Sequence, residues 1–393
     1  MQILILLSLA LSILASPLCE HEPHVQTPGR RVTFTHPGIL HTLDDLNRMK
    51  YGVGNKTEPW YTAYQNMSGD PLASSSYTLK GPMTYVTRNA TGSSPGKAQL
   101  ANDSVASLLN ALMWYITGET AYAEKSVEIL NAWGGTLTLI NGTDAQLAAS
   151  LLGAQLVNAA EIMRYTYSDW ADEDISTFKE MILKVFYPPA SQTTASATQE
   201  YPFLANWGTS GEKAIVAFGV FLDNATMYNQ GLDLYQTFAC ADLNNTINAN
   251  GQNSESGRDQ AHTQLGLGNM AELCQTAYNQ GENYWDLLDS RLMVGYEYTA
   301  SYNLGNTVDY DPSFYRCGAD LVGGPWSVIS ATDRGQWRPI YEIAYAYFAQ
   351  VEGLSMPYTK QVIEANPIEA NDATNNLDDS ASYGTLRFSR GVV

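Results

Sequence analysis

The sequence predicts an all-α protein in which helical hairpins form a toroid with few short strands. Apolar residues recur at helical spacing in one segment after another, and Gly, Asn or Pro interrupts the chain between the segments. The interruptions are short, which favours antiparallel pairs of consecutive helices. The sequence contains no exact short-period repeat, which argues against a regular solenoid. A plain bundle is the simpler alternative, but bundles seldom need so many hairpins, so we expect inner helices that line a cavity.

The first half of the chain carries clear helical signals. Residues 42–45 (TLDD) resemble a capping box at the start of a helix. Apolar positions between Tyr122 and Trp133 are spaced to form a buried stripe. A later helix should end at residues 187–189 (YPP), because proline disfavours helical geometry in the residue before it. The helices expected here are 100–116, 121–133, 144–163 and 172–186.

The second half follows a loop rich in Ser, Thr and Ala over residues 190–199. Links such as 223–224 and 279–281 are short enough for hairpins. Strands are expected only within residues 79–87 and in the tail from Thr385. The helices expected here are 209–222, 226–238, 260–278, 284–302 and 339–351.

The N-terminus indicates secretion. Residues 1–19 read as a signal peptide, because an apolar run too short to span a membrane is followed by small residues. Residues 20–393 then form a single domain, expected to be an extracellular monomer. One disulfide among Cys240, Cys274 and Cys317 is expected outside the cell, with no assignable pairing. Sequons typical of a secreted glycoprotein begin at Asn55, Asn66, Asn89, Asn102, Asn141, Asn224 and Asn244.

The net charge of −19 excludes nucleic acid as a partner, because phosphate binding needs a basic surface. No later apolar run is long enough to span a membrane. An anionic substrate would be repelled at long range, so its site must rely on local cations. Arg258, Arg316 and Arg338 are the candidates.

An unusually polar stretch, residues 253–264, leads directly into an apolar helical run. If the helix extends back to Arg258, then Arg258 and His262 lie one turn apart on the same face. A cation beside a titratable imidazole suits a site for an anionic substrate, and Gln264 would contribute a polar contact. The alternative is a solvated helix start, with Glu255 and Asp259 near the positive end of the helix dipole.

Two further segments carry candidate residues. Asn206 and Trp207 precede a helix, where backbone N–H groups favour an anion, although Asn206 could simply cap the helix. Tyr298 and Tyr302 lie one helical turn apart. Such an aromatic stripe is more often core than catalytic, but Tyr302 is followed by Asn and Gly and can stand at a cavity rim. Candidate substrate-binding residues in the following loops are Tyr315, Arg316 and Arg338.

Several common site motifs are absent from the sequence. It contains no Gly-x-Ser-x-Gly elbow, no Walker loop, no dinucleotide fingerprint and no His-Glu-x-x-His pair. Asp309 and Asp311 are better explained as a solvated loop than as a calcium site. Neither a metal nor an organic cofactor is expected.

Together these segments resemble a polysaccharide lyase of the alginate-lyase-like superfamily, and within it polysaccharide lyase family 38. The resemblance rests on residues 36–42 (HPGILHT), 206–208 (NWG), 255–262 (ESGRDQAH) and 297–305 (EYTASYNLG). It implies an (α/α) toroid and β-elimination on a 1,4-linked uronate polymer such as mannuronate-rich alginate or glucuronan. Lyases of this superfamily often carry Asn-His where this chain has Asn206 and Trp207, which leaves carboxylate neutralisation to Asn206 and the later cluster.

The expected chemistry removes the C5 proton of a uronate and expels the C4 oxygen. Asn206, Arg258 and His262 suit neutralisation of the carboxylate. Tyr302 is the first choice for proton transfer, and His262 as base with Tyr298 or Tyr302 as acid is the alternative.

Other functions fit parts of the sequence. A glycoside hydrolase would use two carboxylates, such as Glu255 or Asp259 with Glu297. A non-catalytic glycan-binding protein would bind through Trp207 and Tyr302. A lyase of dermatan or heparin type would share the chemistry of the uronate lyases but act on animal glycans.

Overall fold

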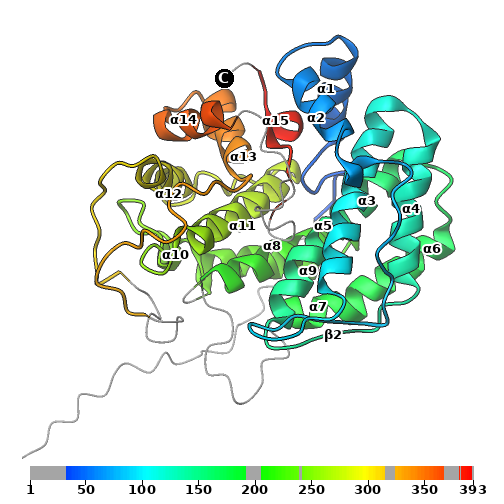
Figure 1. Ribbon diagram of the computed structural model, residues 1–393, viewed down its shortest axis with the longest axis horizontal. Helices are drawn as coiled ribbons and strands as arrows, with labels where there is room; N and C mark the ends of the chain where they lie inside the picture. The colour runs from blue at the N-terminus through cyan, green and yellow to red at the C-terminus, as the bar shows by residue number, and fades with distance from the viewer. Residues whose placement is uncertain are drawn as a thin grey trace, which may run out of the picture.

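A computed structural model describes residues 32–191, 205–238, 241–314, 324–366, 380 and 382–391. Helices dominate this part of the chain, and most of the longer ones pack against the helix that follows them (Figure 1). One set of helices forms an inner series, in which each contacts the next: α3 (Lys97–Thr117), α5 (Ala145–Thr166), α8 (Asn206–Phe221), α11 (Gln260–Asn279) and α13 (Tyr341–Tyr345). The helices that alternate with them along the chain are α4 (Thr120–Gly134), α6 (Asp172–Met181), α9 (Ala225–Thr237), α12 (Leu287–Asn303) and α14 (Pro357–Ala365).

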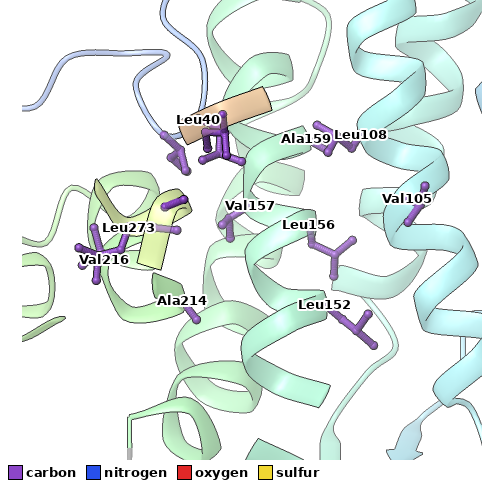
Figure 2. Packing of buried hydrophobic residues seen from close by; sticks show 14 of the residues in the cluster. Leu40, Val105, Leu108, Leu152, Leu156, Val157, Ala159, Ala214, Val216 and Leu273 are labelled. Carbon is purple, nitrogen blue, oxygen red and sulfur yellow. The ribbon is translucent and has the colours of Figure 1, made fainter. Parts of the chain in front are cut away.

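Most residues of α3, α5, α8 and α11 are buried, and most of the buried ones are apolar or small. In α5, every residue from Gln146 to Met163 is buried. Gly153 lets α5 approach its neighbours, since a Cβ there would lie 2.7 Å from Phe218 of α8. Figure 2 shows buried side chains of α3, α5, α8 and α11 in this core. This packing fixes the inner helices relative to one another.

The two ends of the described chain close the ring. The C-terminal α15 (Gly384–Phe388) contacts α13 and α1 (Leu43–Gly54), and α1 packs on α3. The buried Arg387 donates from Nε to Nε2 of His41 at 3.1 Å. Burial and the Arg387 charge lower the pKa of His41 to about 3, so this imidazole is neutral. The expected (α/α) toroid is therefore the observed fold.

The minor elements fill the links between the helices. A parallel two-stranded sheet joins β1 (Tyr85–Thr87) to β2 (Leu139–Asn141). The remaining elements are α2 (Trp60–Ser68), α7 (Tyr187–Ala190), α10 (Leu243–Thr246), η1 (Pro71–Ala73) and the π-helical segments η2 (Ile182–Phe186) and η3 (Ala346–Val351). Among the described helices, none is long and apolar enough to cross a membrane.

Most expected helices are confirmed to within a few residues, including the capping box at Thr42. Two expectations are wrong. The helix from Asp172 does not stop at the prolines, because they occupy the first turn of α7, where proline needs no N–H partner. The tail from Thr385 is helical, since α15 packs against α13 and α1. Cys274 is a buried free thiol, 3.5 Å from the Tyr235 hydroxyl. Cys240 and Cys317 lie outside the described residues, so the expected disulfide stays a prediction.

Candidate active site

The first turn of α8 places Asn206 beside the loop that precedes α11. Ala205 has a positive φ of 46°, a strained conformation for a non-glycine residue, and the helix starts at the next residue. Asn206 is buried and does not cap the helix. Its Nδ2 donates instead to Oε1 of Glu255 at 2.7 Å, and its Oδ1 has no hydrogen-bond partner among the described residues. The cap alternative for Asn206 is therefore wrong.

Glu255 connects Asn206 to Arg258. Oε2 of Glu255 lies 3.4 Å from an Nη1 donor of Arg258, and the Glu255 backbone N–H donates to Asn253 at 2.8 Å. Burial raises the pKa of Glu255, although Arg258 and His262 act in the opposite direction. One buried carboxylate thus holds an amide and a guanidinium at the same place.

Asp259 brings Arg258 and His262 together by a route that the sequence did not suggest. The helix α11 begins at Gln260, so Arg258 lies in the preceding loop and the expected helical turn between Arg258 and His262 is absent. Asp259 is the N-cap, and its Oδ2 lies 2.6 Å from Nδ1 of His262 and 3.8 Å from Nε of Arg258. Partial burial raises the pKa of Asp259, but the hydrogen bonds from His262 outweigh it and hold that pKa below its usual range.

We name Asn206, Glu255, Arg258, Asp259 and His262 the α8–α11 cluster. Its outer side is formed by Arg258 and His262, whose side chains are 21% and 35% exposed. The start of α8 packs against the middle of α11 here, since Nδ2 of Asn269 in α11 donates to the backbone carbonyl oxygen of Asn206 at 3.3 Å. Helix N-termini favour an anion, and an amide with a guanidinium can neutralise a carboxylate.

Tyr302 lies near the cluster at the end of α12. The next residue, Asn303, donates to Gln260 of α11 at 2.9 Å. The guanidinium of Arg334 lies 3.9 Å from the centre of the Tyr302 ring and donates to its backbone carbonyl at 2.7 Å. Arg334 therefore fixes the position of Tyr302 by stacking and by hydrogen bonding.

Other predicted site residues have structural contacts that compete with substrate binding. The hydroxyl of Tyr298 donates to the Asp309 carbonyl at 2.8 Å, and burial raises the pKa of Tyr298. Gln264 is fully buried; its Nε2 donates to Gln336 at 2.8 Å, and its Oε1 accepts from the Arg338 backbone at 3.1 Å. These contacts occupy the hydroxyl of Tyr298 and the side-chain amide of Gln264 within the protein.

Trp207 is partly exposed at the start of α8. It packs on a small apolar group formed by Leu147, Leu151 and Leu265. The amide of Gln146, near the start of α5, donates to the Trp207 carbonyl at 2.7 Å. Arg338 is also partly exposed. Tyr315 and Arg316 lie outside the described residues.

The structure adds aromatic residues that the sequence analysis missed. A Cβ on Gly257 would lie 2.5 Å from Cβ of Trp326 and 2.5 Å from the Tyr310 hydroxyl, so both side chains pack on the backbone beside Arg258. Trp326 and Tyr310 are partly exposed. Glycine immediately before Arg258 was the only available signal, and it does not identify the residues that pack on it.

The carboxylate of Glu297, a candidate for a hydrolase, holds the start of another helix. Glu297 accepts hydrogen bonds from the backbone N–H groups of Tyr358 and Thr359 at 3.0 and 2.8 Å, which caps the start of α14. Its carboxylate is thus committed to α14, whereas Glu255 faces Asn206 and Arg258. Among the described residues, no group of His, Cys, Asp and Glu side chains could hold a metal ion.

The chain is similar to known alginate lyases. Solved structures with the same fold include an alginate lyase from Bacteroides ovatus, at 15% identity and a TM-score of 0.56 over 88% of this chain and 100% of that one. Alginate lyase A1-III from Sphingomonas species A1 matches at 10% identity and a TM-score of 0.61 over 88% of this chain and 95% of that one. A histidine-to-alanine variant of A1-III complexed with a tetrasaccharide matches at 11% identity and a TM-score of 0.61, over 89% of this chain and 95% of that one.

No curated protein sequence matches the chain. The family model described as alginate lyase matches residues 53–309, which include the whole α8–α11 cluster and Tyr302. This match covers more than half of the sequence, and the fold is the toroid described above, so the match establishes the family. The chain belongs to the alginate lyase family of polysaccharide lyases.

Proposed function

We propose that this chain, as a member of polysaccharide lyase family 38, cleaves 1,4-linked uronate polymers by β-elimination, with polymannuronate-type alginate or glucuronan as substrate. The observation that carries the proposal is the α8–α11 cluster, in which Asn206 and Arg258 converge beside the Asp259–His262 pair. A related alginate lyase has been solved with a bound tetrasaccharide, which is in line with an oligosaccharide ligand.

The reaction requires a neutralised carboxylate before the C5 proton can leave. Donors from Asn206 and Arg258 stabilise the negative charge that moves onto the uronate carboxyl group as C5 loses its proton. The C4–O bond then breaks, a double bond forms between C4 and C5, and the leaving oxygen takes up a proton. No step needs a cofactor, because the electrons remain within the sugar.

The Asp259–His262 contact supports His262 as the base. An ionised Asp259 accepts a hydrogen bond from the Nδ1–H group of His262, so Nε2 is the ring nitrogen that accepts the C5 proton. Tyr302, held under Arg334, is then the acid that protonates the leaving oxygen. In the other assignment, Tyr302 alone removes the C5 proton and protonates the leaving oxygen. The variants described below distinguish the two assignments.

The test is incubation with polymannuronate, glucuronan and pectate while ultraviolet absorbance follows the unsaturated uronate. We expect absorbance to rise on polymannuronate or glucuronan, and Asn206→Ala and Arg258→Ala to lose at least about 100-fold in kcat/KM. Glu297→Gln is the matched control, since it removes a carboxylate from outside the cluster and should keep the activity. Reducing ends without new absorbance would instead establish a hydrolase, and binding without turnover would establish a glycan-binding protein.

We also propose that the protein is secreted and glycosylated. Among the sequon asparagines, Asn55, Asn66 and Asn141 are exposed, which is compatible with an attached glycan. Asn102 is less exposed, and its Nδ2 donates to the Ala98 carbonyl within α3 at 2.7 Å. Expression in a eukaryotic host should give medium-borne protein that loses mass on enzymatic deglycosylation, and an unchanged mass would refute glycosylation.

A further inference from the structure

The carboxylate of Glu255 occupies the centre of the α8–α11 cluster and has no role in the proton transfers above. Only 1% of its side chain is exposed. It accepts a hydrogen bond from Asn206 at 2.7 Å and lies 3.4 Å from Arg258. In the free protein, Glu255 therefore engages both donors that the uronate carboxylate needs.

A second carboxylate at this place would create a charge conflict. The ionisable groups that act on Glu255 are Arg258, His262 and Asp259, and α8 faces it with the uncharged amide of Asn206. Asp259 is itself a carboxylate whose Oδ2 is paired with His262. Arg258 alone carries a permanent positive charge here, so it cannot balance both an ionised Glu255 and a bound uronate.

The amide of Asn206 offers a way to resolve the conflict. Its Oδ1 is buried and accepts no hydrogen bond from the described residues. A protonated Glu255 has an O–H donor and could supply that missing hydrogen bond if the Asn206 amide turned over. Nδ2 would then no longer donate to Glu255, which frees its hydrogens from that carboxylate.

We propose that Glu255 takes up one proton from solvent when the uronate carboxylate binds at Asn206 and Arg258, and thereby releases these two donors to the substrate. The inference rests on the proposed function, because it requires a uronate at the cluster. Glu255 is a positioning residue in this scheme, since it acts on the substrate through Asn206 and Arg258. Burial already raises the pKa of Glu255, which makes proton uptake less costly.

Proton uptake makes binding depend on pH in a defined direction. The affinity of Glu255 for a proton is higher in the complex than in the free protein, so binding weakens as pH rises between the two ionisation points. The Kd then increases by up to about tenfold per pH unit in that window. Replacement of Glu255 by the neutral, equally sized Gln removes this dependence.

The experiment is calorimetric titration of the full chain carrying His262→Ala, which removes the imidazole as another source of proton uptake. The probe is an oligosaccharide of polymannuronate, or of glucuronan if that polymer is the one cleaved. Titrations in phosphate and in Tris, whose ionisation enthalpies differ, give the number of protons bound. We expect the His262→Ala chain to take up close to one proton per bound oligosaccharide. The chain that carries both His262→Ala and Glu255→Gln should take up no proton at position 255.

Glu297→Gln in the same His262→Ala background is the matched control, because it removes a carboxylate from outside the cluster and should leave the uptake in place. Equal uptake with and without Glu255→Gln would overturn the inference, as would no uptake in the background variant. If the Glu255→Gln chain does not fold, the His262→Ala chain by itself still tests the inference, because binding without proton uptake by that chain would overturn it. A full chain that neither binds nor cleaves any uronate polymer refutes the proposed function, whereas binding without proton uptake refutes only this inference.

Discussion

At the scale of the residue, the site depends on which polar atoms the framework occupies and which it leaves for the substrate. The two tyrosines of α12 illustrate this difference. The Tyr298 hydroxyl donates to the Asp309 carbonyl, whereas the Tyr302 ring lies under the guanidinium of Arg334. The same residue type, one helical turn apart, thus has two different expected roles.

Tyr302→Phe tests the acid. We expect kcat to fall by at least about 100-fold with little change in KM, because the hydroxyl contributes to the transition state rather than to binding. Tyr298→Phe is the matched control and should retain most activity while losing about 1 kcal/mol of stability. Steady-state kinetics on the cleaved polymer and urea denaturation measure the two effects. A Tyr302→Phe enzyme with a near-normal rate would exclude this tyrosine from proton transfer.

Asp259→Asn tests the orientation of the imidazole. Asparagine still caps α11, but it no longer holds the Nδ1 proton of His262 through a charged oxygen. We expect kcat to fall by at least about tenfold while the melting temperature stays close to that of the original chain. His262→Ala should be slower still. If the two variants keep full activity, Tyr302 alone transfers the protons.

At the scale of the element, buried polar side chains fix loops to helices. Asp103 of α3 is fully buried and accepts hydrogen bonds from the Tyr77 hydroxyl, the Trp133 indole and the backbone N–H groups of Lys80 and Gly81, at 2.7 to 2.9 Å. The carboxylate thereby joins the extended segment before β1 to the α3–α4 pair.

Asp103→Ala should therefore be strongly destabilising. Several buried donors lose their acceptor together, and we expect a loss of about 3 kcal/mol or more in the free energy of unfolding. Urea denaturation followed by circular dichroism measures the loss. Asn102→Ala, at the adjacent and more exposed position, is the control and should change stability by less than about 1 kcal/mol. A small effect of Asp103→Ala would show that the segment is held by its apolar contacts.

At the scale of the whole molecule, stability depends on carboxyl groups within the ring of helices. Glu212 of α8 is fully buried, and neither carboxyl oxygen has a hydrogen-bond partner among the described residues. Burial, with a smaller contribution from Asp242, raises the pKa of Glu212 well above 4.5. The folded protein therefore holds this carboxyl group in its protonated form.

The sign of the resulting pH dependence follows from linkage. As pH rises above 4.5, Glu212 ionises in the unfolded chain while burial resists its ionisation in the folded one. The contribution of Glu212 to the free energy of unfolding is therefore complete below that pH and declines as pH rises. Glu212→Met, which is uncharged and of similar size, should remove a decline of up to about 1.4 kcal/mol per pH unit. Urea denaturation at pH 5 and about pH 8 compares the two chains. Parallel pH profiles would show that Glu212 ionises normally in the folded protein.

The sequence by itself determined the helical hairpins and most of their bounds, because apolar spacing and capping act between residues close together in the chain. It also identified Asn206, Arg258, His262 and Tyr302 as candidates from local polar composition. The tertiary structure decided how they are held: Glu255 binds Asn206 across 49 positions of the chain, and Arg334 covers Tyr302 from a distant loop. It also turned the tail around Thr385 into a helix, because α15 packs against α13 and α1. Such contacts join segments far apart in the sequence, so no local pattern specifies them.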